Sequence, residues 1–241
     1  MENPLHHFEL HTLVPIQIGG IDLSITQGVV MMWLAVAAAF AVLFFPAARL
    51  KLVPGRRQSI VEMAVVFLRD MTVELIGKKG PRFLPILAAL FFFVLFCNLL
   101  GLIPGTFTAT SQIFVTGALA VTAYLVSVGV GLKYHGLHYF KIFAPTGTPS
   151  WLVPLMVPIE VISHLARPLS LALRLFANMT AGHTILAVLF SLTVSLGIVL
   201  GWLPFGFTVA IYLLEFAVAF IQAYIFTILT TVYIGDAVHL H

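Results

Sequence analysis

Apolar residues along this chain form five long runs that are separated by short polar segments. The runs cover residues 25–46, 83–103, 111–132, 151–200 and 203–236. Each of the first three has about the 20 residues that a helix needs to cross the hydrocarbon layer of a membrane. These three runs end at or just before Pro46, Pro104 and Lys133. The pattern predicts an all-α integral membrane protein, organised as a single membrane domain over residues 1–241.

The last two runs are too long for an ordinary membrane span. As one helix, residues 151–200 would be about 75 Å long, against a hydrocarbon thickness of about 30 Å. Such a helix must tilt steeply, bend or re-enter, and Pro168 in its interior can bend it near His164. The turn sequence GWLPFG begins at Gly201. Two long helices joined by a Gly/Pro turn predict a strongly tilted antiparallel hairpin.

Basic residues predict how the chain is oriented. Eight of the twelve Lys and Arg residues lie in the segment from Arg49 to Arg82, whereas residues 1–24 contain none. The positive-inside rule therefore places that segment in the cytoplasm, with the N-terminal residues 1–24 outside and the C-terminus inside. Within the basic segment, residues 59–77 read as an amphipathic helix on the membrane surface. A capping box of Ser59 and Glu62 is expected to open it.

The amino-acid composition indicates which kind of molecule surrounds this chain. The chain is 61% hydrophobic and 9% charged, with a mean hydropathy of +1.09, so its main partner is the lipid bilayer. A net charge of +3 is too small to indicate a nucleic-acid partner. No glycine loop for phosphate binding occurs. His135 and His138 form a weak metal-like pair without Cys or carboxylate companions, so solvated loop histidines are the favoured interpretation and no metal or cofactor is expected. The chain alone is therefore expected to catalyse nothing.

Arg174 lies within one of the most apolar parts of the chain, where a cation costs roughly 2.5 to 3.5 kcal/mol. Steps of three and four residues put small and polar residues on its helical face. They are Glu160, Ser163, Arg167, Ser170, Asn178 and Ala181. Small and polar residues also glue membrane helices together, which is an equal alternative for Ser170. The helical neighbours of Arg174 include no carboxylate, so its counter-ion must come from elsewhere. A guanidinium cannot lose its proton, and it therefore suits a fixed positive barrier that repels protons.

The second helix of the hairpin carries Glu215 and Gln222, seven residues apart and so on one face. One antiparallel register places His183 opposite Glu215 and Arg174 opposite Gln222. Imidazole and a desolvated carboxylate can both titrate near neutral pH, which makes His183 and Glu215 a candidate proton-relay pair. A purely structural hydrogen bond is the alternative. Glu160 has a local partner in His164, four residues on.

Several of these segments match a known family. The runs SLALRLFANMTAGH, IEVISHLARPLS and LLEFAVAFIQAYIFTILTTVYI closely resemble subunit a in the membrane sector of the F-type ATP synthase. FVLFCNLLGLIPG is similar to the family's motif at the end of an earlier helix. The resemblance extends from about Arg56 to Ile234.

The resemblance implies a proton-conducting stator subunit without catalytic activity of its own. Protons would flow at the interface with a rotating ring of c subunits, each bearing a membrane carboxylate, and peripheral-stalk b subunits would be further partners. Arg174 falls on the family's essential arginine, which keeps two half-channels apart. The other matching positions are Asn178 and Gln222 beside it, Glu160, His183 and Glu215 in the aqueous pathways, and Ser170, Arg167 and His164 as secondary positions. Arg167 fits a snorkelling role at the membrane interface equally well.

The order of His183 before Glu215 resembles alphaproteobacterial and mitochondrial members of that family. A bacterial inner membrane is the expected location, ahead of the mitochondrial inner membrane. A stand-alone secondary cation/proton transporter is the alternative function, and it would neutralise its membrane charges within its own chain and show paired repeats. An intramembrane metalloprotease would need a motif such as HExxH, but Glu160 and His164 stand in the wrong order.

Overall fold

The computed structural model describes residues 12–15, 17–18, 21–22, 24–48, 54–103, 106–143 and 152–239. Six α-helices dominate this part of the chain. They are α1 (Gln27–Ala47), α2 (Arg56–Ile76), α3 (Leu84–Gly101), α4 (Ile113–His135), α5 (Val153–Leu200) and α6 (Trp202–Val238). Short 3-10 helices connect them: η2 (Gly77–Arg82), η3 (Ala109–Ser111) and η4 (Gly136–Phe143).

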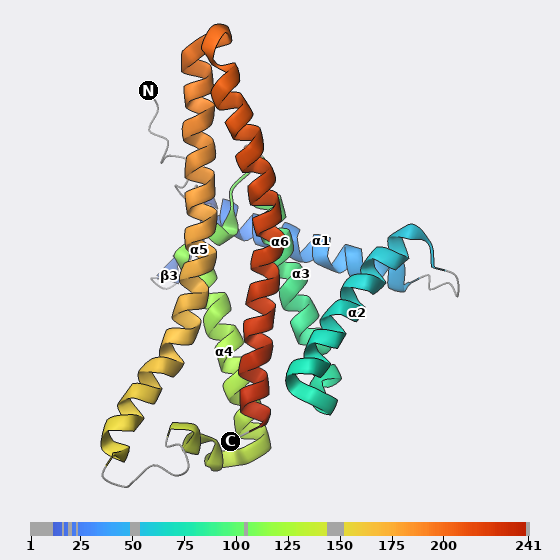
Figure 1. Ribbon diagram of the computed structural model, residues 1–241, viewed down its shortest axis with the longest axis vertical. Helices are drawn as coiled ribbons and strands as arrows, with labels where there is room; N and C mark the ends of the chain where they lie inside the picture. The colour runs from blue at the N-terminus through green and yellow to red at the C-terminus, as the bar shows by residue number, and fades with distance from the viewer. Residues whose placement is uncertain are drawn as a thin grey trace.

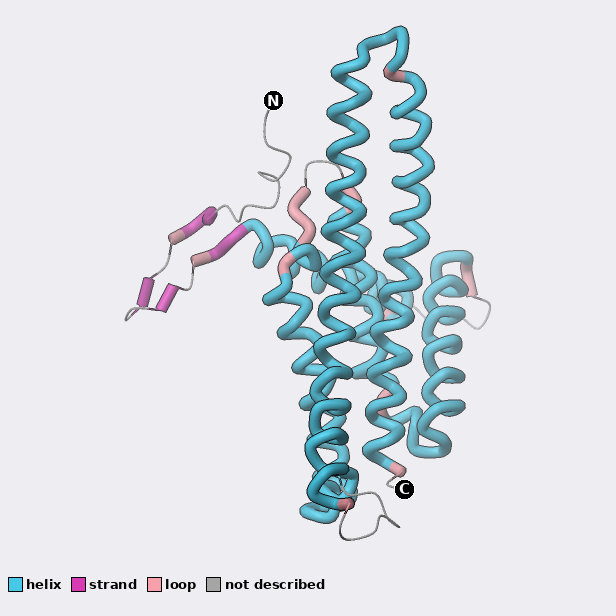
Figure 2. Tube along the Cα trace, turned by 60° about the vertical axis from the view of Figure 1, so that its left-hand side comes forward, coloured by secondary structure: helices cyan, strands magenta, loops and turns pink. Residues whose placement is uncertain are grey.

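Five of these helices are long and apolar enough to cross a membrane, namely α1, α3, α4, α5 and α6. This confirms the prediction of an all-α membrane protein. Four short strands before α1 were not predicted: β1 (Thr12–Val14), β2 (Gln17–Ile18), β3 (Ile21–Asp22) and β4 (Ile25–Thr26). They form two antiparallel pairs, β1 with β4 and β2 with β3, at one side of the helices (Figure 2). Strands of two or three residues are too short for an alternating pattern to reveal them.

The start of α2 differs from the prediction. The helix begins at Arg56, after Gly55, and the hydroxyl of Ser59 donates to the Gly55 carbonyl at 3.2 Å. Ser59 therefore lies within the first turn and does not cap the helix, so the predicted capping box with Glu62 is wrong. One face of α2, with Leu68, packs into the core, while other apolar side chains on it are exposed. That α2 lies on a membrane surface stays a prediction.

The core lies behind the middle of the hairpin formed by α5 and α6 (Figure 1). Aromatic and aliphatic side chains from α3, α5 and α6 meet there, among them Phe92, Leu95, Leu171, Leu175 and Phe226. Burial of such side chains against one another holds the two long helices to α3 and α4. One face of α5 is thereby fixed toward the core, and the opposite face is left uncovered.

The helices α5 and α6 run antiparallel and side by side, and their turn projects beyond the other helices (Figures 1 and 2). Gly197 makes the turn possible with a φ of 63°, a conformation that favours glycine. Gly201 follows, so close to the carbonyl of Thr193 that no side chain would fit. The turn thus begins four residues before the predicted GWLPFG sequence, because that sequence forms the first turns of α6 from Trp202 onward.

The helix α1 lies crosswise to the hairpin of α5 and α6. The apolar stretch of α1 has 20 residues and that of α5 has 45. At 1.5 Å per residue these are about 30 Å and about 68 Å. Figures 1 and 2 show α1 crossing the long axis of the hairpin at a large angle. That the hairpin lies steeply tilted in the membrane stays a prediction. The N-terminal part of α5, with Pro168 inside it, leans away from α6 (Figure 1).

Candidate functional site

Arg174 lies on the uncovered face of α5. The neighbouring Leu171 and Leu175 are buried in the core, whereas Ser170, Arg174 and Asn178 are exposed. We call these three exposed residues the arginine face. Among the described residues, Arg174 makes no hydrogen bond or ion pair. Within the part of the chain that the structure describes, this guanidinium therefore has no counter-ion.

Asn178 and Gln222 connect the arginine face to α6. The amide nitrogen of Asn178 donates to Oε1 of Gln222 at 3.1 Å, and Gln222 is almost fully buried. The predicted register placed Arg174 opposite Gln222, but Asn178, one turn farther along α5, takes that place. Asn178 and Arg174 lie one turn apart on the same face of α5, so the hydrogen bond of Gln222 goes to the next residue along the predicted face.

Toward the tip of the hairpin lies a group that we call the tip-side cluster, made of Thr108, His183 and Glu215. Nε2 of His183 lies 2.8 Å from the hydroxyl of Thr108, which precedes η3. The carboxylate of Glu215 lies against Gly182, where an added Cβ would collide with it. Oε1 of Glu215 is buried and has no hydrogen-bond partner among the described residues. The prediction paired His183 directly with Glu215. In the structure the Glu215 carboxylate lies against Gly182, the neighbour of His183, and the His183 ring contacts Thr108.

Two further polar residues that were not predicted lie in the same part of the fold. The Thr110 hydroxyl donates to Oδ1 of Asn98 at 2.9 Å, and both side chains are fully buried. Asn98 comes from α3, within the motif FVLFCNLLGLIPG, where it is the only polar side chain in an apolar run. That isolation was the available signal, since a buried amide in a membrane helix needs a partner.

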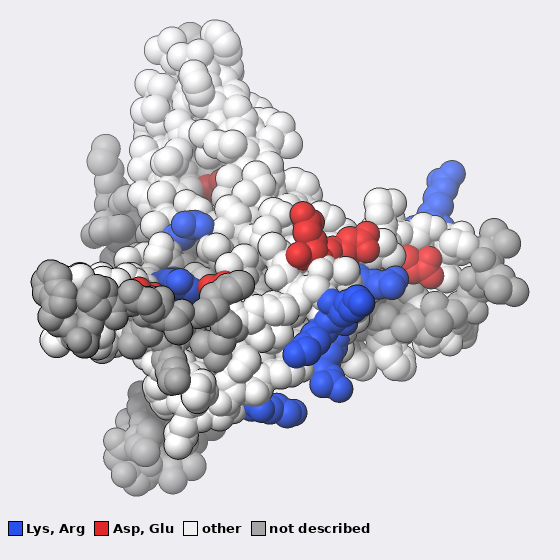
Figure 3. Space-filling view, turned by 60° about the horizontal axis from the view of Figure 1, so that its bottom comes forward, with Lys and Arg blue, Asp and Glu red and all other residues white. Residues whose placement is uncertain are grey.

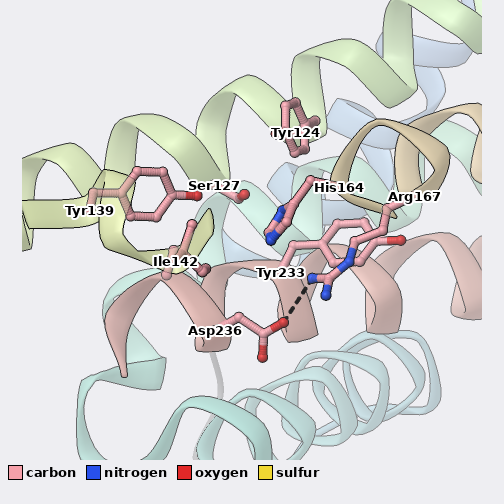
Figure 4. A pocket seen from close by; sticks show the side chains of 9 residues that line it. Tyr124, Ser127, Tyr139, Ile142, His164, Arg167, Tyr233 and Asp236 are labelled. Atoms are coloured by element: carbon pink, nitrogen blue, oxygen red, sulfur yellow. Dashed lines mark hydrogen bonds and ion pairs between the residues drawn. The ribbon is translucent and has the colours of Figure 1, made fainter. Parts of the chain in front are cut away.

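On the other side of Arg174 lies the pocket cluster, made of Glu160, His164, Arg167 and Asp236. Arg167 and Asp236 point toward each other from α5 and α6 (Figure 4), and Nη1 lies 2.9 Å from Oδ2. Nε2 of His164 lies 3.6 Å from Oε1 of Glu160, an ion pair only when the imidazole is protonated. The predicted neighbours Glu160 and His164 are thus brought together, and Arg167 has a partner that was not predicted.

The pocket beside this cluster is lined mainly by polar side chains. Tyr124, Ser127, Tyr139 and Tyr233 contribute hydroxyl groups around His164 and Arg167 (Figure 4). The guanidinium of Arg167 also lies over the ring of Tyr233, 5.6 Å from its centre. Hydroxyls and carboxylates at this spacing can carry water or protons, but no group of three or more metal-ligating side chains occurs among the described residues.

Polar groups therefore lie on both sides of Arg174, which has no ion partner in the described ranges. Along α5, Arg174 follows Arg167 by seven residues and precedes His183 by nine. At 1.5 Å per residue these separations are about 10 Å and about 14 Å. A proton moving between the two clusters along the hairpin would have to pass the positive potential of Arg174. The arrangement can separate two polar pathways.

Comparison with known proteins identifies the family. The chain matches the family model described as ATP synthase A chain over residues 29–235. It belongs to that family. A relative from Magnetococcus marinus, named ATP synthase subunit a, is 50% identical over 245 residues, covering 99% of this chain and 94% of the relative. The protein of the same name from Rhodospirillum rubrum is 44% identical, and the match covers 100% of this chain and 100% of the relative. The one from Rhizobium leguminosarum bv. trifolii is 46% identical, and the match covers 98% of this chain and 97% of the relative.

Family membership confirms the resemblance seen in the sequence. Together with the five long apolar helices, it makes the chain a multi-pass membrane protein of the ATP synthase A chain family. The motif around Arg174 and the hairpin both lie inside the matched range.

Proposed function

We propose that this subunit of the ATP synthase membrane sector is its proton-conducting stator, with two half-channels separated by Arg174 at the interface with a rotating c-ring. The observation that carries the proposal is the position of Arg174. It is exposed on the arginine face, it has no ion partner among the described residues, and a polar cluster lies on each side of it.

An unpaired cation at membrane depth is costly, so Arg174 calls for an acid from another molecule. A ring of c subunits, each with a carboxylate at membrane depth, supplies one acid after another as it turns. Because the guanidinium stays charged, it draws the carboxylate into its ionised form, and the displaced proton leaves through one pathway. A stand-alone transporter, the alternative function, would neutralise such a charge within its own chain.

The two clusters are assigned to the two half-channels from their surroundings. Asp236 of the pocket cluster lies near the C-terminal end of α6, and the following His239 contacts the Ile76 carbonyl at 2.9 Å. Ile76 is followed by η2, which contains Lys78, Lys79 and Arg82. A group of Lys and Arg side chains gathers on this face in Figure 3. By the positive-inside rule the pocket cluster opens toward the cytoplasm, and the tip-side cluster opens toward the periplasm.

The same orientation puts the N-terminus outside and the C-terminus in the cytoplasm, and we place the chain in a bacterial inner membrane because its relatives come from bacteria. Peripheral-stalk b subunits would hold the chain against the turning ring. Protons are the ion that suits the tip-side cluster, because the imidazole of His183 and the carboxyl group of Glu215 can both take up and release a proton.

The decisive test replaces Arg174 by Ala in the complete ATP synthase, in inverted membrane vesicles. ATP-driven proton pumping should be abolished, and an imposed proton gradient should leak through the membrane sector. Leu173→Ala is the matched control, because Leu173 is the exposed neighbour of Arg174 on the same helix and carries no polar group. Pumping that survives in the Arg174→Ala complex would contradict the barrier.

A further inference from the structure

Thr108 is held rigidly where α3 ends and η3 begins. Its side chain is 5% exposed and lies so close to Gly101 that an added Cβ there would collide with it. The hydroxyl of Ser111 donates to the Thr108 carbonyl at 2.7 Å, and the Ser111 amide does so at 3.1 Å. Because glycine at 101 gives the side chain its space and Ser111 holds its backbone, Thr108 has little freedom to rotate.

The Thr108 hydroxyl has two polar neighbours. The carbonyl oxygen of Gly101 lies 3.2 Å from Oγ1, and Nε2 of His183 lies 2.8 Å from it. A hydroxyl has one proton to donate, whereas a carbonyl can only accept. Gly101 is in the last turn of α3, where carbonyls lack helical partners and take donors from elsewhere.

These contacts decide which nitrogen of His183 carries the proton. If Thr108 donates to the Gly101 carbonyl, its oxygen offers only lone pairs to His183, and Nε2 must be the N–H group. The opposite arrangement would set two lone-pair-bearing oxygens 3.2 Å apart in a buried site and deprive the Gly101 carbonyl of this donor. The first arrangement satisfies all three groups.

We propose that Thr108 is a positioning residue that fixes neutral His183 as the Nε2–H tautomer, so that Nδ1 is the atom that takes up and releases the transported proton. A proton arriving at Nδ1 gives an imidazolium, which still donates from Nε2 to Thr108. Departure of that proton from Nδ1 restores the neutral ring. The proton thus enters and leaves on one edge of the ring, and the contact with Thr108 persists throughout.

This inference rests on the proposed function, in which His183 belongs to a half-channel. Its test uses the complete ATP synthase with 15N-labelled histidine, in membranes at alkaline pH, where the ring is neutral. Solid-state NMR distinguishes a bare from a protonated nitrogen at each ring position, and loss of one signal set in His183→Gln assigns His183. We expect a bare Nδ1 and a protonated Nε2 in the unmodified protein.

Two substitutions at Thr108 sharpen the test. Thr108→Val keeps the shape but removes the hydroxyl, so it should yield a mixture of tautomers and slow proton pumping severalfold. Thr108→Ser keeps the hydroxyl and should restore both. Thr116→Val is the control, because Thr116 is also buried but its hydroxyl bonds carbonyls one turn back, 3.1 Å from that of Ile113. Neither the tautomer nor pumping should change in the control.

A bare Nε2 in the unmodified protein overturns the inference, whether or not the Val variant assembles. An unchanged tautomer in an assembled Thr108→Val complex overturns it as well. A different result would contradict the proposed function. In that case the complex with His183→Gln would pump protons at the full rate, whatever tautomer the spectra show in the unmodified protein.

Discussion

Two arginines on the same helix meet opposite surroundings. Arg167, in the pocket cluster, has Asp236 at 2.9 Å and the ring of Tyr233 beneath its guanidinium. Arg174, two turns farther on, is exposed and has no ion partner among the described residues. The contrast teaches that one helix of this chain carries both an arginine paired within the chain and an arginine with no ion partner in the described ranges. Under the proposed function, the second charge is left for an acid on another molecule.

The largest expected difference comes from replacing each arginine by lysine. Arg174→Lys should abolish ATP-driven pumping, because an ammonium can lose its proton and lacks the planar fork of a guanidinium. Arg167→Lys should keep most of the pumping, since a lysine can still pair with Asp236 as a point charge. Pumping is measured by quenching of a pH-sensitive dye in inverted vesicles. Equal loss in both variants would remove the distinction between the two sites.

A smaller effect is expected from breaking the internal pair. Asp236→Asn leaves the charge of Arg167 uncompensated in a half-exposed pocket, and pumping should fall severalfold. Adding Arg167→Gln removes the orphaned charge and should restore part of the rate, so the two defects are not additive. Additive losses in this double-mutant cycle would show that the pair does not act as a unit. Assembly of the complex is checked by its content of this subunit.

The smallest effect is expected from adding one carbon atom beside the tip-side cluster. Gly182→Ala adds one carbon where the carboxylate of Glu215 lies, so the carboxylate must move and pumping should slow. Gly206→Ala adds the same carbon to exposed α6 with nothing within 4 Å, and it should be silent. If Gly182→Ala is as silent as its control, the position of Glu215 does not matter to proton transfer.

The sequence predicted the hairpin and the face of Arg174 because both depend on local patterns. The length of the apolar run predicted the bounds of α5 to within two residues. Helical periodicity placed Ser170, Arg174 and Asn178 on one face of that helix. Near Arg174 the partner of Gln222 is one helical turn away from the predicted one, because helical spacing shows which face of α5 meets α6 but not which of two residues one turn apart makes the hydrogen bond.

Partners contributed by distant segments could not be predicted in the same way. Thr108 reaches His183 across 75 residues of sequence, and Asp236 reaches Arg167 across 69. Asp236 is the last residue of the predicted run 203–236, where an acidic residue is typical of a solvated helix end. Local periodicity carries no information on which helix ends come to lie beside α5, so these contacts needed the tertiary structure.

The most direct test of the central claim is to ask what covers the arginine face in the assembled enzyme. A cysteine is placed at Ser170, another beside the carboxylate of a c subunit, and the buried Cys97 is first replaced by Ala. Oxidation should yield a disulfide between the two subunits. The same experiment with Ala172→Cys, which is 5% exposed and turned toward the core, should yield none. Cross-linking from position 172 but not from 170 would mean that the ring does not meet the face of Arg174.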